Sequence, residues 1–339
     1  MFVRNAWYAA AWEREVGDRP LAATIAGESV AIFRRTDGSF AAVHDACPHR
    51  KVPLSMGRVL GDRLECGYHG MQFDGTGCCV KAPTNGTIPH GANIAAFPVV
   101  ARYGLLWIWL GDAATADPDD IFEVRHWDDP AWGCTEGDDM IVACHHLLIA
   151  DNLLDPSHVA WVHPGSFAGQ GTDDTPMEIT IGDHGVTVWR WLHDTAPPPF
   201  YAPYLPFNGN CDRKQQYEVR YPSNALITAV FTPAGTGGED RPLPESTFVM
   251  DSYNFLTPVD DHTTRYFWFQ IRNVAPDDAE VSRQFAASVK SAFAEDKVLL
   301  EAVQHGLDTA TSAPLNLRSD TGGIRFRRRH TQLVEAEQP

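Results

Sequence analysis

The sequences CPHR at residues 47–50 and CGYHG at residues 66–70 each hold one cysteine and one histidine. One residue separates the pair in the first stretch, two separate it in the second, and sixteen residues lie between the pairs. Zinc also accepts two cysteines and two histidines, but zinc fingers usually keep the cysteines in one turn and the histidines elsewhere. Because each stretch supplies one of each, the pattern favours an iron–sulfur cluster whose cysteines bind one iron and whose histidines bind the other. The expected ligands are Cys47, His49, Cys66 and His69.

Strand-like runs surround both pairs. Apolar runs flank Asp37-Gly38, a dipeptide typical of tight hairpin turns, and similar runs flank the glycines at 75 and 77 and the sequence at 102–104. Residues 1–112 are therefore expected to form a small all-β domain. The sequence GDAATADPDD that begins at residue 111 reads as a linker, and residues 113–339 form the second expected domain.

Charge is distributed unevenly along the 339 residues. The formal net charge is −17, which argues against a nucleic-acid partner. Residues 1–112 carry a net charge of +1 and the remainder a net charge of −18. No apolar run approaches the ~18 residues of a membrane span, and the N-terminus lacks the apolar core of a signal peptide. We expect a soluble cytoplasmic protein without membrane attachment, whose seven cysteines bind metal or remain thiols.

The second part of the chain mixes helical and strand-like patterns. Apolar residues recur with helical spacing from residue 141 until Pro164. Residues 177–275 return to strand-like runs, broken by a proline- and aromatic-rich loop at 195–207, and residues 277–307 have the pattern of one long helix. These features predict an α+β fold, with an antiparallel sheet and a long helix near the C-terminus.

The sequence DNLLDPSHVAWVHP at residues 151–164 suggests a second metal site. Residues 155 and 158 share a helix face, but His158 and His163 are five positions apart, roughly 140° around a regular helix. The helix is therefore expected to unwind or bulge near residues 159–163. Two histidines at a helix end are often structural. Two histidines and one carboxylate, however, form the site of non-haem Fe(II) oxygenases. The long helix supplies the carboxylate, and chemistry alone leaves Asp296 and Glu295 open.

Taken together, the chain resembles the α subunits of Rieske non-haem iron oxygenases, and within them the vanillate O-demethylase group, which includes dicamba and toluenesulfonate methyl monooxygenases. The resemblance covers nearly the whole chain. It is carried by the cysteine–histidine pairs and by the sequences RNAWYAAAW, GLLWIWLGD, DNLLDPSHVAWVH and FAEDK. Family members often have Pro and Trp where this chain has Gly67 and Met71, a departure in the loop lining rather than in a ligand.

This resemblance implies roles for individual residues. Asp296 becomes the carboxylate ligand beside His158 and His163, Asn152 lies near the iron, and Asp155 bridges to the site from a Rieske histidine of a neighbouring subunit. It also implies a homotrimer and a catalytic domain of helix-grip (START-like) type. The basic residues near the cluster motif are expected to form the docking site of an acidic partner. These residues are Arg50, Lys51, Arg58 and Arg63.

The implied activity is that of a terminal oxygenase. A ferredoxin-type reductase passes electrons from NADH to the [2Fe–2S] cluster and on to a mononuclear Fe(II), which uses O2 to O-demethylate a vanillate-like aromatic acid. N-demethylation and methyl-group hydroxylation of another aromatic substrate are the alternatives within this class. A Rieske electron-transfer protein without oxygenase activity is a second reading, although such a protein would end near residue 112. A START-like binding module with a structural zinc domain is a third.

The sequence does not identify the substrate. Asn254 and the aromatic loop at 195–207 are candidates to contact it. An arginine would suit a substrate carboxylate, although structural pairing is the commoner role of such residues. The arginines considered are Arg190, Arg220 and Arg272.

Overall fold

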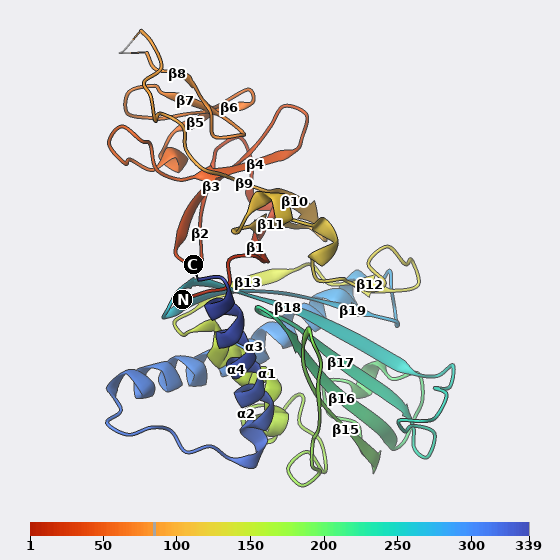
Figure 1. Cartoon of the computed structure of the whole chain (residues 1–339). Helices are drawn as coiled ribbons and strands as arrows, with labels where there is room; N and C mark the ends of the chain where they lie inside the picture. The colour runs from red at the N-terminus through yellow and green to blue at the C-terminus, as the bar shows by residue number, and fades with distance from the viewer. Residues whose placement is uncertain (84–85, 339) are drawn as a thin grey trace. The chain divides into compact units, whose positions relative to one another are not determined.

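The computed structural model describes residues 1–83 and 86–338, which divide into two compact units (Figure 1). The first unit contains Met1–Glu123 together with Thr257–Asp260 and the C-terminal end. The second contains Val124–Leu256 and Asp261–Glu335. Within the described residues, no helix is both long enough and apolar enough to span a membrane.

The first unit is built from small antiparallel sheets. In the described residues their strand orders are β1-β11-β10, β2-β3-β4-β9 and β5-β6-β7-β8. The strands are β1 (Trp7–Trp12), β2 (Leu21–Ile25), β3 (Glu28–Arg34), β4 (Phe40–His44), β5 (Arg58–Leu60), β6 (Arg63–Glu65), β7 (Gln72–Asp74), β8 (Cys79–Lys81), β9 (Ala96–Phe97), β10 (Val99–Arg102) and β11 (Leu105–Trp109). Short 3₁₀ turns lie between strands at Glu13–Glu15 and Leu54–Met56, and two more follow β11 at Ala113–Thr115 and Pro118–Asp120.

All three predicted hairpins of this unit are confirmed. Strands β3 and β4 pair around Asp37-Gly38, β7 and β8 pair around the turn with Gly75 and Gly77, and β10 pairs with β11. The last turn places Tyr103 and Gly104 in the left-handed region, with φ of 60° and 72°. Glycine adopts that conformation without strain, which explains why Gly104 marks this turn in the sequence.

The second unit is dominated by one antiparallel sheet. Its described strands follow the order β12-β19-β18-β17-β16-β15-β14, and β13 also pairs with β19. The strands are β12 (Gly133–Cys134), β13 (Asp138–Val142), β14 (Glu178–Ile181), β15 (Gly185–Thr195), β16 (Cys211–Arg220), β17 (Asn224–Pro233), β18 (Phe248–Asp260) and β19 (Thr263–Arg272). The helices are α1 (His146–Leu154), α2 (Val159–Val162), α3 (Ala279–Thr309) and α4 (Thr321–Ala336), with 3₁₀ turns at Pro156–His158, Ala202–Tyr204 and Arg318–Asp320.

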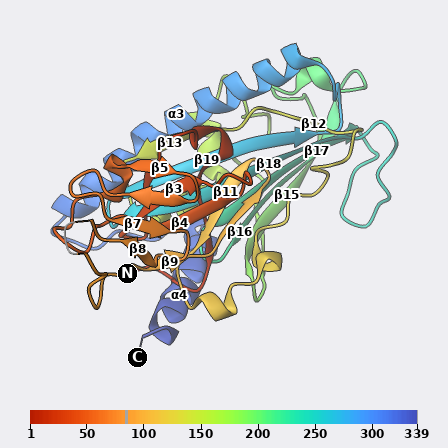
Figure 2. The ribbon, with the colours of Figure 1, turned by 90° about the horizontal axis from the view of Figure 1, so that it is seen from above.

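The predicted long helix is confirmed as α3, which runs along the sheet (Figure 2). Asp278 caps it by accepting hydrogen bonds from the backbone amides of residues 280 and 281. Buried residues recur every three or four positions, which is the spacing of one helix face, and they include Phe285, Val289, Phe293 and Leu300. Asp296 lies on this same apolar face, so its carboxylate points into the interior rather than to solvent.

The helix break in the metal-site segment lies earlier than predicted. Helix α1 ends at Leu154, Asp155 takes a non-helical conformation with φ −125° and ψ 75°, and a 3₁₀ turn begins at Pro156. Residues 159–162 are helical again as α2, so the expected unwinding at 159–163 is wrong in position. Proline disfavours a helical conformation in the residue before it and donates no backbone hydrogen bond, which explains why the helix breaks at Asp155.

Candidate metal centres

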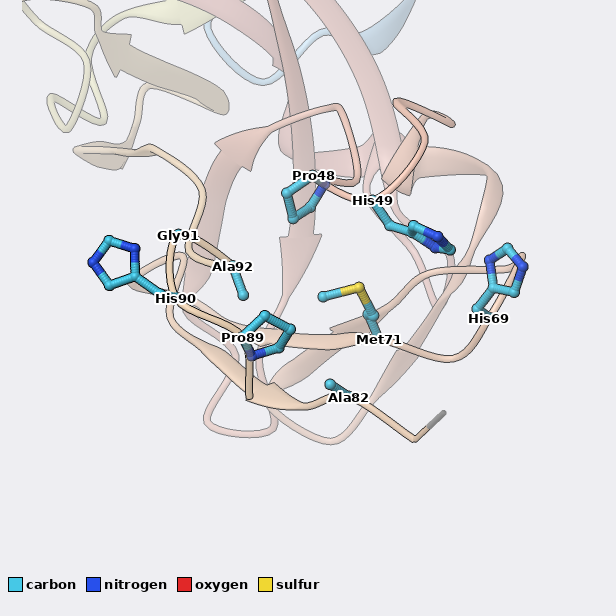
Figure 3. A pocket seen from close by; sticks show the side chains of 9 residues that line it. All are labelled: Pro48, His49, His69, Met71, Ala82, Pro89, His90, Gly91 and Ala92. Atoms are coloured by element: carbon cyan, nitrogen blue, oxygen red, sulfur yellow. The ribbon is translucent and has the colours of Figure 1, made fainter. Parts of the chain in front are cut away.

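The two cysteine–histidine pairs meet in the first unit. Cys47 and Cys66 are buried in its core, each 2% exposed. His49 is exposed and His69 partly so, and the centroids of the two imidazole rings are 4.6 Å apart. Both rings border a surface cavity of ≈ 270 Å³ (Figure 3). The thiols therefore face the protein interior and the imidazoles face outward, which is an asymmetric donor set.

This arrangement fits a cluster with two chemically different iron atoms. Burial raises the pKa of the Cys47 thiol, the neighbouring Cys66 adds to the effect, and the backbone amides of His49 and Arg50 oppose it. A buried thiol of this kind becomes a thiolate when a metal replaces its proton. Neutral imidazole ligands in place of thiolates raise the reduction potential of a [2Fe–2S] centre.

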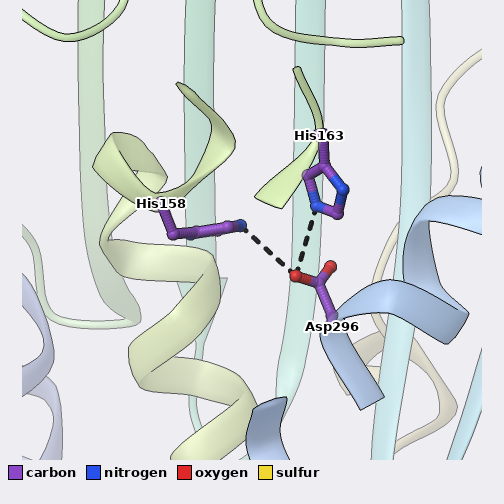
Figure 4. A group of neighbouring side chains, drawn as sticks. All are labelled: His158, His163 and Asp296. Atoms are coloured by element: carbon purple, nitrogen blue, oxygen red, sulfur yellow. Dashed lines mark ion pairs between the residues drawn. The ribbon is translucent and has the colours of Figure 1, made fainter. Parts of the chain in front are cut away.

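In the second unit, a compact group of metal-binding donors is formed by His158, His163 and Asp296. One donor atom from each lies within 4.8 Å of the others. The Nε2 atoms of His158 and His163 are 3.5 and 3.2 Å from Oδ1 of Asp296, and Figure 4 shows the three side chains converging on one point. His163 and Asp296 are buried. Two imidazoles and a carboxylate are the donors that non-haem iron(II) prefers.

Protein contacts fix the orientation of both imidazoles. Nδ1 of His158 donates to the backbone carbonyl of Asp155 at 2.6 Å, and Nδ1 of His163 donates to the carboxylate of Glu295 at 2.6 Å. Each ring therefore presents Nε2 to Asp296, as a metal-binding tautomer requires. Burial alone would lower the pKa of His163, but hydrogen bonds and charge from Asp296 and Glu295 outweigh it and raise that pKa.

The structure separates the two carboxylates that chemistry left open. Asp296 belongs to the converging group, whereas Glu295 contacts the far nitrogen of His163. Asn152 lies close by and donates to Oδ1 of Asp296 at 3.4 Å. Sequence reasoning missed the contact from Glu295, because adjacent helix residues point about 100° apart and the packing of α3 decides which of them faces the histidines.

A narrow cavity of ≈ 70 Å³ opens beside this group. Its lining combines the metal-site residues with aromatic and aliphatic side chains from β16, β17, β18 and α3. Tyr201, from the predicted aromatic loop, reaches the cavity, as does one cation, Arg213, that sequence reasoning did not single out. The lining also includes Asn152, Phe167, Tyr217, Ile227, Met250 and Phe293.

Other candidate residues lie outside this cavity. Asn254 is fully buried and is not brought to it, because its amide donates to the carbonyl of Ser252 and accepts from the Tyr266 hydroxyl at 2.9 Å. Asp155 borders a different cavity of ≈ 500 Å³, and its carboxylate caps the following 3₁₀ turn by accepting from Ser157.

The three arginines considered from the sequence all have protein partners. Arg190 donates to Gln215 and to the carbonyl of Thr175, each at 2.8 Å. Arg220 pairs with Glu218. Arg272 is buried and donates to the carbonyl of Ala275 and to the hydroxyl of Ser282. These contacts give each of the three a structural explanation, and none of the three lines the cavity beside the metal group.

Comparison with known proteins places both units in families. Residues 6–98 match the Rieske [2Fe-2S] domain, and residues 142–336 match the vanillate O-demethylase oxygenase C-terminal domain. The chain is 35% identical to a putative toluene-4-sulfonate monooxygenase system iron-sulfur subunit of Comamonas testosteroni, over 99% of this chain and 98% of the relative. It is 34% identical to a vanillate O-demethylase oxygenase subunit of a Pseudomonas species, over 100% and 96% of the two chains.

The fold agrees with these matches. A crystal structure of dicamba monooxygenase bound to 3,6-dichlorosalicylic acid superimposes with a TM-score of 0.91 at 33% sequence identity, covering 99% of both chains. Because the Rieske and C-terminal family matches, the full-length relatives and this structure all agree, the chain belongs to the vanillate O-demethylase family of Rieske non-haem iron monooxygenase oxygenase subunits.

Proposed function

We propose that this oxygenase subunit O-demethylates a methoxylated aromatic acid. The observation that carries the proposal is the buried group of His158, His163 and Asp296 at the wall of an aromatic-lined cavity. Ligand sites are mostly apolar with a few placed polar groups, and this cavity has that character. The relatives named above act on vanillate and toluene-4-sulfonate, both of which are anionic benzene derivatives.

The proposed ligands follow from the donor sets. Cys47, His49, Cys66 and His69 hold a [2Fe–2S] cluster, and His158, His163 and Asp296 hold a mononuclear iron. Once bound, these groups supply single-electron transfer and the activation of O2 for insertion into a C–H bond. The two histidines keep Nε2 directed at the site through their Nδ1 contacts, and Asn152 holds the Asp296 carboxylate in place.

The surrounding protein determines where oxygen is inserted. The apolar cavity holds an aromatic ring with its methoxy methyl beside the ligand group and limits the access of water. Hydroxylation of that methyl gives a hemiacetal, which collapses to a phenol and formaldehyde. The balance is one O2, one NADH and one proton consumed for each phenol, formaldehyde and water formed, with the electrons delivered by a ferredoxin-type reductase.

Asp155 is proposed to connect the two centres across a subunit boundary. Its carbonyl fixes His158, and its side chain borders the cavity of ≈ 500 Å³, so the residue contacts both the metal site and an accessible surface. The carboxylate is proposed to accept a hydrogen bond from His69 of the partner subunit. This arrangement requires an oligomer, and we propose a homotrimer.

Exposed apolar side chains on the second unit support such an assembly. They include Trp161, Val298 and Leu315, which are 79%, 68% and 87% exposed, and removing such apolar surface from water between subunits is favourable. On the first unit, Arg58 pairs with Glu65 of its own unit. Arg50 and Lys51 are exposed and form no ion pair among the described residues, so we propose them as the docking site for the acidic reductase.

We further propose that residues 1–112 and 113–339 act as cluster domain and catalytic domain, and that the protein works in the cytoplasm. All seven cysteines lie in the described part of the chain and none forms a disulfide, as is usual in a reducing compartment. NADH supplied through a reductase is likewise an intracellular reductant.

The test is release of formaldehyde from a panel of methoxybenzoates, with NADH, O2 and a compatible reductase. We expect stoichiometric formaldehyde and phenol from at least one of them, with vanillate the first to try. Oxidation of aryl methyl groups without formaldehyde release would replace O-demethylation with methyl hydroxylation. This alternative is favoured by the similarity to the toluene-4-sulfonate system, because toluene-4-sulfonate has no methoxy group.

A further inference from the structure

The cavity beside the candidate iron ligands contains a buried cation with no assigned role. Arg213 lies on β16 at one of the alternating buried positions that it shares with Gln215 and Tyr217. Alternation places these three side chains on the inner face of the sheet. Arg213 is 3% exposed, and it lines the same cavity as His158 and Asp296.

The guanidinium of Arg213 has incomplete protein contacts. Nη2 donates to the backbone carbonyl of Phe167 at 2.9 Å. The group also lies over the rings of Tyr201 and Phe231, at 5.8 and 5.5 Å from their centroids. Nε has no hydrogen-bond partner, and within residues 1–83 and 86–338 no carboxylate forms an ion pair with Arg213. One carbonyl and two ring faces therefore provide the contacts, and none of them carries a negative charge.

Two other buried arginines of the same unit, Arg190 and Arg272, also leave side-chain N–H groups without a hydrogen-bond partner, but neither lines the cavity beside the candidate iron ligands. The partly buried Arg265, in contrast, donates from Nε to the carboxylate of Asp139 at 2.8 Å. Arg190, on the neighbouring strand, uses Nε and Nη1 on Gln215 and Thr175, and it borders the cavity near Asp155 rather than the one beside the iron ligands. Arg213 is thus the cation of the metal-site cavity, and its charge lacks the counterion that burial normally requires.

We infer that Arg213 is the specificity-determining residue that anchors the anionic group of the aromatic substrate, a carboxylate or sulfonate. The planar guanidinium fork matches such groups through paired hydrogen bonds. With the anion on Arg213, the ring lies among Phe167, Tyr201, Met250 and Phe293, which line the same cavity. The inference rests on the proposed function, because it explains how that substrate is selected in the same cavity.

The test measures binding and not turnover. Iron-loaded oxidised protein, without reductant, is titrated calorimetrically with vanillate and with 2-methoxyphenol, which has the same ring and methoxy group but no carboxylate. We expect the wild type to prefer the anion. Arg213→Met should weaken vanillate binding by about 100-fold, the size typical of breaking a buried charge pair, and should change 2-methoxyphenol binding by less than about 3-fold. Arg213→Lys, which keeps the charge, should recover part of the vanillate affinity.

Arg190→Met is the matched control, because it removes a buried arginine one strand away that does not line this cavity. It should leave the preference for the anion unchanged. Equal weakening of both ligands by Arg213→Met would show that Arg213 only packs the cavity wall, and the inference would be wrong. It would also be overturned if the wild type bound no aromatic acid or sulfonate more tightly than its neutral counterpart, a result that does not depend on whether the variant folds.

The same experiment separates the anchor from the reaction. A strong preference for the anion that depends on Arg213, without formaldehyde release during turnover, would support the role of Arg213 in binding the anion and contradict O-demethylation. Formaldehyde release that Arg213→Met leaves unchanged at subsaturating vanillate would support O-demethylation and contradict the role of Arg213 in binding the anion.

Discussion

The two proposed metal centres differ in how far apart in sequence their candidate ligands lie. The candidate cluster ligands fall between residues 47 and 69, on two loops of one small β unit. The proposed iron ligands combine two histidines that follow the helix break at Asp155 with a position on α3, which is 133 residues beyond His163. Local turns specify the first site almost completely, whereas the second exists only once α3 packs against the α1–α2 segment. The second site should therefore be the more sensitive to single substitutions around it.

The largest effect is expected from Asp296→Ala. Removing the carboxylate should empty the mononuclear site while leaving the cluster, so that iron falls from about three to about two per chain. Activity should drop by more than about 100-fold, since even residues that merely orient a ligand are worth 10–100-fold. Iron analysis and the visible absorption of the cluster measure the two sites separately.

Glu295→Ala provides the comparison for this variant. A protein that keeps its third iron after Asp296→Ala and loses it after Glu295→Ala would reverse the assignment of the carboxylate. Loss of cluster absorption in Asp296→Ala would instead indicate that the two centres are not independent, contrary to the separate ligand sets described above.

Asp155→Asn should slow turnover strongly without emptying either site. The backbone carbonyl that holds His158 is retained, but an amide cannot replace a carboxylate as the charged partner of a cluster histidine. Turnover should fall by about 100-fold, the upper end for an outer residue of a metal site. A single-turnover assay on pre-reduced protein is decisive, because a normal product yield would exclude Asp155 from the connection between the centres.

Glu295→Gln is expected to have a moderate effect. The amide keeps the shape of the side chain but weakens the hold on Nδ1 of His163, whose pKa the two carboxylates raise against the opposing effect of burial. Iron affinity should fall by about 10-fold, which competition with a chelator measures. An unchanged affinity would mean that the exposed Glu295 does not contribute to the orientation of His163.

The smallest effect is expected at the cluster unit. The double change Arg50→Glu and Lys51→Glu should lower reductase-driven kcat/KM by about 10-fold at low salt, because opposite charges steer association. The deficit should shrink as salt screens the charges. Activity driven by peroxide should stay normal. Reductase kinetics that are identical to those of the wild type at all salt concentrations would contradict the proposed docking site.

The sequence predicted features that depend on local turns better than features that depend on long-range packing. The hairpins at 28–44 and 72–81 were readable because Asp-Gly and paired glycines mark tight turns. Helix α3 was readable from the helical pattern of residues 277–307. Asp296 and Glu295 were equally plausible as the carboxylate ligand on chemical grounds. The choice between them depends on how α3 is rotated against the sheet.

Helix α4 shows why some elements escaped prediction. Its first turn contains Gly322 and Gly323, residues of low helix propensity, followed by several arginines. The structure explains the glycines, since a Cβ on Gly323 would lie 2.4 Å from Oδ1 of Asp151 and one on Gly322 would lie 3.0 Å from Val188. Close packing against α1 and β15 therefore requires the two glycines, and these same glycines weaken the helical pattern of the sequence. Arg213 escaped for a related reason, because strand alternation does not show which inward positions border a cavity.

The long-range origin of the proposed iron ligands has a consequence for thermodynamic stability. An ion bound by His158, His163 and Asp296 holds α3 against the α1–α2 segment in the folded chain and has no equivalent site in the unfolded one. Such linkage adds about 2.7 kcal/mol at a free metal concentration 100 times Kd. Resistance of the second unit to heat should therefore track iron supply, so that iron-starved cells would hold a protein that is less durable as well as inactive.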